Sequence, residues 1–466
     1  MHEQTSADSD QQLQALGYKQ ELKRSMSVLD VVVFGLIYMV PMAPMAVFGV
    51  VYEFSAGMPV LVYVIAAIAM FFSAVSYAEM AKRYPIAGSV YSYVRQGLGA
   101  GLGFLAGWAI LLDYLLLPAL LAVFAAVAME GELPAVPAAV WVIIFVVAAT
   151  AIVLRGVTLT ARANLIFLII QLVVIGMFIA GALIAIAQGR AHFELAALFK
   201  ADNFTWAIAF GAIPVAALNF IGFDAISTLN EEAKGGGRAV SKATMIVLAA
   251  VTVLFMAQVY FAALFVPTGG FTDDAAVNSA FYTIAGVVIA PWFQTLVTLT
   301  SALIAIFANS IASQSTTSRL VFSMARDRQL PSFLAHVSPK RKVPSHAILL
   351  IAGLSMVIGL VGTSHLALLT TLVVFGALTA YMLLHVSVFV HLGLNSSTRN
   401  TARHLISPVL GVAVLGYALW NSDIHAKTLG VCWIAVGAGI YLVLRMRGKT
   451  IGAPGLDDER STQAVG

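Results

Sequence analysis

The sequence is poor in cysteine and in charged residues, and each shortage excludes classes of protein. Cys432 is the only cysteine among 466 residues, which excludes an intramolecular disulfide, a paired-cysteine metal site and a redox pair. Charged residues make up 10% of the chain and hydrophobic residues 60%, against about 25% and about 45–50% in soluble domains. A soluble fold of this size could not bury so much apolar surface. The composition therefore indicates an integral membrane protein rather than a soluble enzyme, a secreted scaffold or a disordered chain.

The sequence also lacks the motifs of phosphate binding and catalysis. The three glycines at 235–237 have neither the spacing nor the Lys-Ser/Thr pair of a phosphate-binding loop. It contains no HExxH motif, no His/Asp catalytic cluster and no selectivity-filter repeat. We therefore expect no enzyme activity, no cofactor, no metal site and no ATP-driven transport by this chain alone.

Long apolar runs fill most of the chain, and the mean hydropathy is +0.93. A bilayer core requires about 20 apolar residues per helix, and continuous runs favour helices over the alternating segments of a β-barrel. The sequence predicts an all-α integral membrane protein with twelve membrane-spanning helices. They are expected at residues 28–52, 59–80, 102–129, 138–155, 164–188, 206–230, 243–267, 285–315, 346–363, 366–392, 405–420 and 427–445.

The basic residues predict the orientation of these spans. With the amino terminus inside, 23 of the 26 Lys and Arg residues fall at cytoplasmic ends, and only Arg190, Lys200 and Lys427 fall outside. This bias is typical of membrane proteins and predicts that both termini are cytoplasmic. Because the first 25 residues are polar, we expect a retained anchor rather than a signal peptide. The formal charge of +4 follows from the topology, so no nucleic-acid partner is expected.

Two spans contain residues that interrupt helices. Pro41 and Pro44 lie near the middle of the first span, and a proline inside a helix costs about 3 kcal/mol. The interrupting residues of the sixth span are Pro214, Asn219, Gly222 and Asp224. Breaks in spans one and six are typical of transporters built from two inverted repeats of five helices. Freed carbonyls there would bind an ammonium group and half-helix amides a carboxylate, whereas a structural kink is the alternative for each span taken alone.

Two carboxyl groups are predicted inside the membrane. Asp113 lies near the middle of the third span, and Asp224 lies in the sixth-span break. A charge at the bilayer centre costs at least about 2.5 kcal/mol, so it usually faces a cavity or a partner. Asp113 could pair with a substrate amine, carry a coupling proton or accept backbone hydrogen bonds. For Asp224 we favour a structural role, as a cap of the second half-helix, over contact with substrate.

Five other polar residues are candidates for coupling or gating. Glu53 lies at the outer end of the first span, and Glu79 lies near the inner end of the second. Asn309 and Ser313 belong to a polar stretch ending the eighth span, where they could line a pathway, hold a cation or pack helices together. His385 in the tenth span could titrate near neutral pH, although an interior histidine with satisfied hydrogen bonds is the commoner case.

Three motifs resemble the amino acid–polyamine–organocation (APC) permease superfamily. They are SYAEMAKRYPIAGSVYSYVRQGLGAGLGFLAGW at 76–108, GFDAISTLNEE at 222–232 and SRLVFSMARDRQLPSFLAHV at 318–337. The resemblance covers residues 22–446, and GLIYMVP and LLDYLLLP in spans one and three look most similar to bacterial putrescine importers. It implies the leucine-transporter fold, with a transport core of helices one to ten in inverted repeats at 26–400. Two accessory helices would follow at 401–446, with cytoplasmic tails at 1–25 and 447–466.

The resemblance also implies a substrate site at the two breaks, facing spans three, eight and ten. Carried onto this chain, the site comprises Tyr38, Pro41, Met42, Ala43, Ala46, Asp113, Phe220, Gly222, Phe223 and Asp224. The chain departs from the putrescine importers at Ala46, where their pattern carries an acid. A diamine needs charge compensation at both ends, so Ala46 disfavours putrescine, whereas Asp113 could still serve one end.

The sequence thus predicts a secondary-active importer of a small amine or amino acid, working by alternating access in the cell membrane. A polyamine such as putrescine is the first expectation, and an amino-acid or monoamine permease or exchanger is the alternative. The resemblance favours protons over sodium as the coupling cation, and a monomer or homodimer is expected. A membrane sensor or a subunit of a larger complex is a second class, but the sequence offers no output domain for it.

Overall fold

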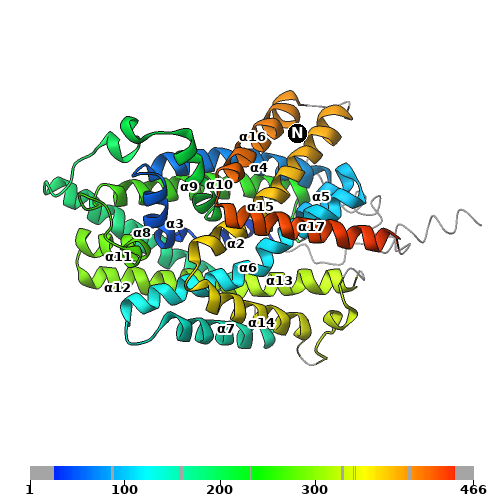
Figure 1. The fold of residues 1–466 in the computed structure, drawn as a ribbon, viewed down its shortest axis with the longest axis horizontal. Coiled ribbons are helices and arrows are strands. Elements are labelled where there is room, and N and C mark those ends of the chain that lie inside the picture. Colours follow the sequence, from blue (N-terminus) through cyan, green and yellow to red (C-terminus); the bar gives the residue numbers. More distant parts are fainter. Residues whose placement is uncertain are drawn as a thin grey trace, which may run out of the picture.

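The chain folds into a bundle of helices (Figure 1). The computed structural model describes residues 26–84, 89–156, 161–230, 232–326, 330–339, 341, 343–396 and 400–446. The predicted tails at 1–25 and 447–466 lie outside the described residues, as do parts of the three family motifs. In the described ranges, the only strand-like pairing is an isolated bridge between Met26 and Ala233. The all-helical prediction is therefore confirmed.

The helices follow one another along the chain with short connections. The α-helices are α2 (Val28–Met39), α3 (Ala43–Phe54), α4 (Pro59–Arg83), α5 (Ser89–Leu98), α6 (Ala100–Glu132), α7 (Ala138–Leu154), α8 (Ala161–Ala187), α9 (Trp206–Leu218), α10 (Gly236–Ala263), α11 (Asp274–Val288), α12 (Pro291–Leu299), α13 (Phe307–Arg326), α14 (Ser345–Gly362), α15 (Leu366–Val388), α16 (Ser407–Trp420) and α17 (Ile424–Met446). Short 3-10 helices are η1 (Leu195–Ala197), η2 (Ala201–Asn203), η3 (Phe223–Leu229) and η5 (Ser332–Ala335), and π-helical segments are η4 (Thr300–Ile306), η6 (Phe389–Leu394) and η7 (Ala402–Ile406).

Each of the twelve predicted spans coincides with a helix or with consecutive helical segments. Among the described residues, ten helices are long and apolar enough to cross a membrane. α2 and α3 together make a further span, bent by 45°. α7 is a shorter apolar helix of 17 residues. The chain therefore has the helices of a multi-pass membrane protein.

Both predicted ends of the eighth span are wrong. The span begins at Pro291 rather than 285, because α11 is a separate helix that ends at Val288. Proline suits the first position of a new helix, where its missing N–H is tolerated. The span then continues through η4 and α13 to Arg326 rather than ending at 315. α11 packs against α3, where a Cβ on Gly49 would overlap the Val277 carbonyl oxygen.

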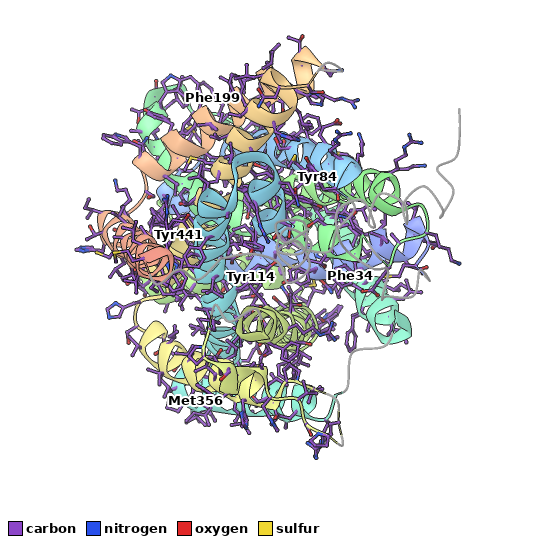
Figure 2. All side chains as sticks on the ribbon, turned by 90° about the vertical axis from the view of Figure 1, so that its right-hand side faces the viewer. Phe34, Tyr84, Tyr114, Phe199, Met356 and Tyr441 are labelled. Atoms are coloured by element: carbon purple, nitrogen blue, oxygen red, sulfur yellow. The ribbon has the colours of Figure 1, made fainter. Side chains whose placement is uncertain are left out.

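α6 lies at the centre of the bundle. The share of the most apolar 18-residue stretch that is buried is 89% in α6, against 17% in α17. Figure 2 shows Tyr114 of α6 near the middle of the molecule, with Met356 and Tyr441 toward its outside. The outer helices expose apolar side chains such as Val253 and Val357, as expected of a surface that faces lipid.

A reciprocal tryptophan pair fastens α17 to α6. Trp108 Nε1 donates to the carbonyl oxygen of Trp433 at 2.8 Å, and Trp433 Nε1 donates to that of Trp108 at 2.7 Å. The two rings are stacked with centroids 4.7 Å apart. Gly437 lies over the Trp108 ring, where a Cβ would overlap the indole. The last helix is therefore attached to the central one by two hydrogen bonds and a stacked pair.

Candidate functional site

The first span breaks between α2 and α3, as its two prolines predict. α2 ends at Met39 and α3 begins at Ala43, with a proline in its first turn. Val40 has a φ of +51°, a left-handed conformation that a β-branched residue rarely adopts. The carbonyl oxygen of Pro41 accepts a 2.9 Å hydrogen bond from Nε2 of Gln258, a fully buried residue of α10. A side chain from another helix therefore satisfies a carbonyl freed by the break.

The second break lies between Asn219 and Gly222, two of the four predicted interrupting residues, and not at Pro214. Pro214 lies inside α9, which continues to Leu218, and the irregular backbone starts at Asn219. Gly222 has a φ of +119°, after which η3 begins. A Cβ on Gly222 would lie 2.7 Å from Tyr38 Cδ1. The glycine, rather than the proline, therefore sets the position of this break and its close contact with α2.

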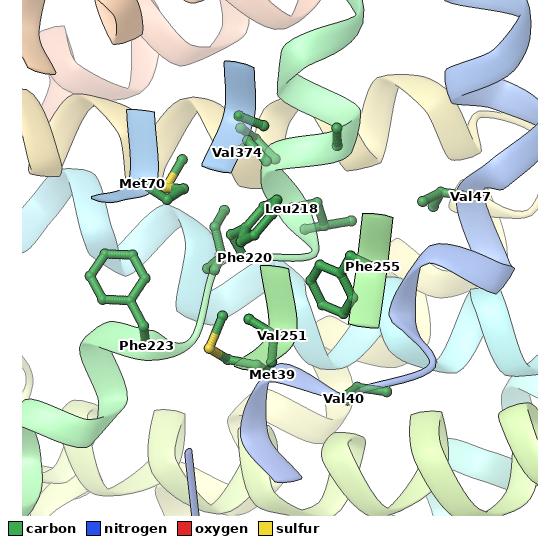
Figure 3. Close-up of a cluster of buried hydrophobic side chains, with 14 of the residues drawn as sticks. Met39, Val40, Val47, Met70, Leu218, Phe220, Phe223, Val251, Phe255 and Val374 are labelled. Atoms are coloured by element: carbon green, nitrogen blue, oxygen red, sulfur yellow. The ribbon is translucent and has the colours of Figure 1, made fainter. Parts of the chain in front are cut away.

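Aromatic packing joins the two breaks in the core (Figure 3). The ring centroids of Phe220 and Phe255 are 5.1 Å apart, and both residues are fully buried. In Figure 3, Met39 and Val40 lie at the bend of the first span, and Phe255 stands between this bend and the segment that carries Phe220. Phe220 is therefore a core residue of the second break, and Phe255 of α10 packs between it and the first break.

Asp224 is buried among three hydrogen-bond donors. Its Oδ1 accepts from the Tyr381 hydroxyl at 3.0 Å and from the Gly222 N–H at 3.2 Å. Its Oδ2 accepts from the Tyr114 hydroxyl at 3.3 Å. The N-cap residue of η3 is Gly222, which has no side chain to cap the helix, and Asp224 accepts the N–H of this residue, a structural role of the kind expected. The carboxyl also links the second break to α6 and α15, and Phe223 beside it packs against Tyr381 with ring centroids 5.5 Å apart.

A cavity lies beside the first break, between α2, α3, α6, the end of α9 and the junction of η4 with α13. Its lining residues are Tyr38, Met39, Val40, Ala43, Ala46, Val47, Leu117, Leu120, Leu121, Phe124, Leu218, Asn219, Ile221, Ile306 and Asn309. The volume of this cavity is about 60 Å³, below the range of about 300–1,000 Å³ that small-molecule sites usually have. Only Tyr38, Asn219 and Asn309 bring polar side chains to the wall.

The cavity gathers some of the predicted site residues and not others. Tyr38, Ala43, Ala46 and Asn309 line it, whereas the following residues do not: Pro41, Met42, Asp113, Phe220, Gly222, Phe223 and Asp224. Asp113 precedes Leu117 by four residues on α6, which places it about 6 Å along the helix from this residue of the wall. Asp113 is buried, and its Oδ1 has no hydrogen-bond partner. This carboxyl therefore lies next to the cavity with hydrogen-bonding capacity unused.

Asn309 reaches the cavity just after a π-helical segment. η4 ends at Ile306, and π-helical turns inside α-helices occur frequently at functional sites. Asn309 Oδ1 and Ser313 Oγ are buried without hydrogen-bond partners. One turn on, Thr317 donates to the Tyr114 carbonyl oxygen at 2.8 Å, which ties α13 to α6. The polar stretch of the eighth span thus contributes Asn309 to the cavity wall and, through Thr317, a hydrogen bond between α13 and α6.

Glu79 lies in an ion-pair cluster away from the cavity. Its carboxylate is 2.9 Å from Lys82 Nζ, 3.2 Å from Arg403 Nη1 and 3.2 Å from His404 Nε2. Asn400 N–H donates to His404 Nδ1 at 3.0 Å. Because Nδ1 accepts there, Nε2 carries the proton that points at Glu79. The cluster joins α4 to η7, ahead of α16.

His385 and Glu53 also lie outside the cavity wall. His385 is fully buried, with Ser73 Oγ 3.1 Å from its Nε2 and Ser76 Oγ 2.8 Å from its Nδ1. A Cβ on Gly411 of α16 would overlap its ring. His385 is thus an interior histidine with both ring nitrogens engaged. Glu53 is exposed at the end of α3.

Sequence reasoning missed the residues that reach the breaks from elsewhere in the chain. Gln258 binds the first break, Tyr381 binds Asp224, and the Asn219 amide donates to Tyr63. A lone glutamine in the apolar run of α10 was the one signal that pointed to Gln258. The two tyrosines carried no comparable signal, because aromatic residues are common in membrane helices.

Comparison with known proteins places this arrangement in a family. A family model described as amino acid permease matches residues 27–442. The chain is 30% identical over 433 residues to the low-affinity putrescine importer PlaP of Escherichia coli (strain K12), covering 91% of this chain and 93% of the relative. It is 28% identical to the methylthioribose transporter of Bacillus subtilis (strain 168), with 92% and 95% covered. It is 25% identical to the branched-chain amino acid permease BcaP of Lactococcus lactis subsp. cremoris (strain MG1363), with 85% and 89% covered.

A solved structure supports the fold. The manganese transporter of Eremococcus coleocola matches with a TM-score of 0.57 and 15% sequence identity, over 91% of this chain and 94% of that one. At this identity the likeness concerns the fold alone. Together with the two broken spans, it confirms an all-α membrane transporter fold of the leucine-transporter type.

Proposed function

This chain belongs to the amino acid permease family, and from that premise we propose that it is a secondary-active, proton-coupled importer of a small amine or amino acid. It would work by alternating access in the bacterial plasma membrane, as a monomer or homodimer, with both termini cytoplasmic. The proposed core of ten helices ends near residue 400, and α16 and α17 are the accessory helices.

The cavity beside the first break is the observation that carries this proposal. It brings together residues of both broken spans, the central helix α6 and the start of α13. Transporters with discontinuous helices bind substrate where such breaks meet. The wall is largely apolar with three polar side chains, a composition typical of small-molecule sites.

The relatives leave several substrates open. PlaP is named for putrescine and BcaP for branched-chain amino acids. Putrescine was the first expectation from sequence, but Ala46 lies in the cavity wall and brings no acid to it. We therefore extend the proposal to small amines and amino acids in general, with Asp113 as the partner of the amine or as the group that carries the proton.

Replacing Asp113 by Asn tests the proposal. The change keeps the shape of the side chain and removes its charge, so accumulation of substrate driven by a proton gradient in proteoliposomes should be abolished. Glu132→Gln is the matched control, because Glu132 lies at the end of the same helix and its carboxylate accepts from Thr295 at the surface. Unchanged coupled uptake by Asp113→Asn would contradict both roles of Asp113. Absence of any amine or amino-acid uptake by the unmodified protein would contradict the proposed function.

A further inference from the structure

The cavity beside the first break offers hydrogen-bond acceptors but few free donors. From this imbalance we propose that it selects a primary monoamine with an apolar body, and that it discriminates against diamines and amino acids. The inference rests on the proposed function, because it names the substrate class of the same site.

The acceptors come from carboxamide and carboxylate oxygens. Asn219 uses its Nδ2 to donate to the Tyr63 hydroxyl, which leaves its Oδ1 to accept. Asn309 Oδ1 is buried without a partner, and so is Asp113 Oδ1 one turn from the wall. An ammonium group carries three donors and no acceptor. It is therefore the group that these oxygens can satisfy.

A carboxylate finds no cationic partner at the same wall, where the Tyr38 hydroxyl, buried without a hydrogen-bond partner, is a neutral donor. No Lys, Arg or His is among the lining residues. Val40, Ala43, Asn219 and Ile221 are the lining residues at the breaks, and each uses its N–H to donate to a carbonyl of its own turn at 2.8–3.2 Å. The Gly222 N–H, at the amino end of η3, is taken by Asp224. The N–H groups of these five residues are thus occupied by the protein itself.

Of the buried carboxyl groups Asp113 and Asp224, one is available to pair with an ammonium group of the substrate. Asp224 is engaged by three donors, from Tyr381, Tyr114 and Gly222. This leaves Asp113 as the buried acid next to the cavity. Beyond Leu117, the wall formed by α3 and α6 is entirely apolar, and this far wall comprises Ala46, Val47, Leu120, Leu121 and Phe124. A second ammonium group would be buried there without a counter-charge, whereas an alkyl or aryl group would be buried favourably.

Two matched pairs of ligands test this inference on the purified full-length protein. Butylamine and putrescine differ by the second amine, and isopentylamine and leucine differ by the carboxylate. We expect Kd values from isothermal titration to favour the monoamine in each pair by on the order of 50-fold, the factor that corresponds to burying one uncompensated charge.

A charge placed in the apolar wall should change this preference. Ala46 has the smallest side chain of the far wall, so Ala46→Asp adds an acid with little added volume. We expect it to improve putrescine binding relative to butylamine on the order of tenfold. Ala46→Asn is the matched control, because it has the same shape without the charge and should not improve putrescine binding. If Ala46→Asp fails to fold, Asn309→Leu supplies the second test and should weaken butylamine binding about tenfold.

The outcomes separate the inference from the proposed function. Putrescine bound as tightly as butylamine, or leucine as tightly as isopentylamine, would overturn the monoamine inference and leave amine or amino-acid transport standing. An equal gain for Ala46→Asn and Ala46→Asp would also overturn it. No binding and no uptake of all four compounds would contradict the proposed function itself.

Discussion

Gly222→Ala probes the contact on which the two broken spans depend. Gly222 has a φ of +119°, and an added Cβ would lie 2.7 Å from Tyr38 Cδ1. Both facts oppose any side chain at this position. We expect the variant to lose stability and to bind substrate weakly, because Tyr38 lines the cavity and must shift.

The magnitude follows from two separate terms. A non-glycine residue with positive φ costs about 1–3 kcal/mol. Forcing a methyl group into a filled site costs about 1–3 kcal/mol more. The free energy of unfolding should therefore fall by about 2–6 kcal/mol, which is large against the total stability of a folded protein.

Chemical denaturation in detergent micelles measures this loss. Gly353→Ala on α14 is the matched control, because a Cβ there meets no atom within 4 Å, and an alanine inside a helix should raise the stability by about 0.5–1 kcal/mol. Combining Tyr38→Leu with Gly222→Ala should recover the part of the lost stability that comes from the contact with the tyrosine ring. The part that comes from the positive φ should remain, and a double-mutant cycle separates the two. If Gly222→Ala is as stable as Gly353→Ala, the contact between the two breaks does not limit the stability of the fold, and the reasoning is refuted.

Two further substitutions probe the polar contacts around the breaks. Gln258→Leu leaves the Pro41 carbonyl oxygen unsatisfied in the core, so the free energy of unfolding should fall by about 1–3 kcal/mol; an unchanged midpoint of denaturation would show that the carbonyl finds another partner. Tyr381→Phe removes one of the three hydrogen bonds to Asp224 and should lower stability by about 1.5–3 kcal/mol. Since Tyr381 does not line the cavity, the substrate Kd of Tyr381→Phe should equal that of the unmodified protein. A variant with full stability and weaker substrate binding would contradict the assignment of Tyr381 as a structural partner of Asp224.

The positions of the helices were predictable because a membrane span depends on the hydropathy of its own residues. Continuous apolar runs located all twelve segments, and Pro41 with Pro44 located the first break. The separate helix α11 and the true start of the eighth span at Pro291 were missed, because hydropathy alone does not separate two apolar helices that follow each other. The division into a ten-helix core and accessory helices stays a prediction.

The second break and the partners of the site depend on distant contacts and were less predictable. Of the four interrupting residues predicted in the sixth span, Pro214 lies inside α9, which runs through it to Leu218. Gly222 sets the break, and its packing partner Tyr38 lies far away in the sequence. Likewise, Asp224 binds Tyr381, which is 157 residues away. No local pattern encodes such a pair, so the sequence located the acid but not the groups that hold it.

The reciprocal tryptophan pair sets a condition on biosynthesis. The two partners are 325 residues apart, so the ribosome must synthesise nearly the whole permease before Trp433 can meet Trp108. Until then the indole N–H of α6 lies in the nascent bundle without this acceptor, at a cost of about 1–3 kcal/mol for an unsatisfied buried donor. Chains truncated before α17 would keep this defect permanently. The pair thus makes completion of translation a requirement for pairing the Trp108 indole N–H of the central helix.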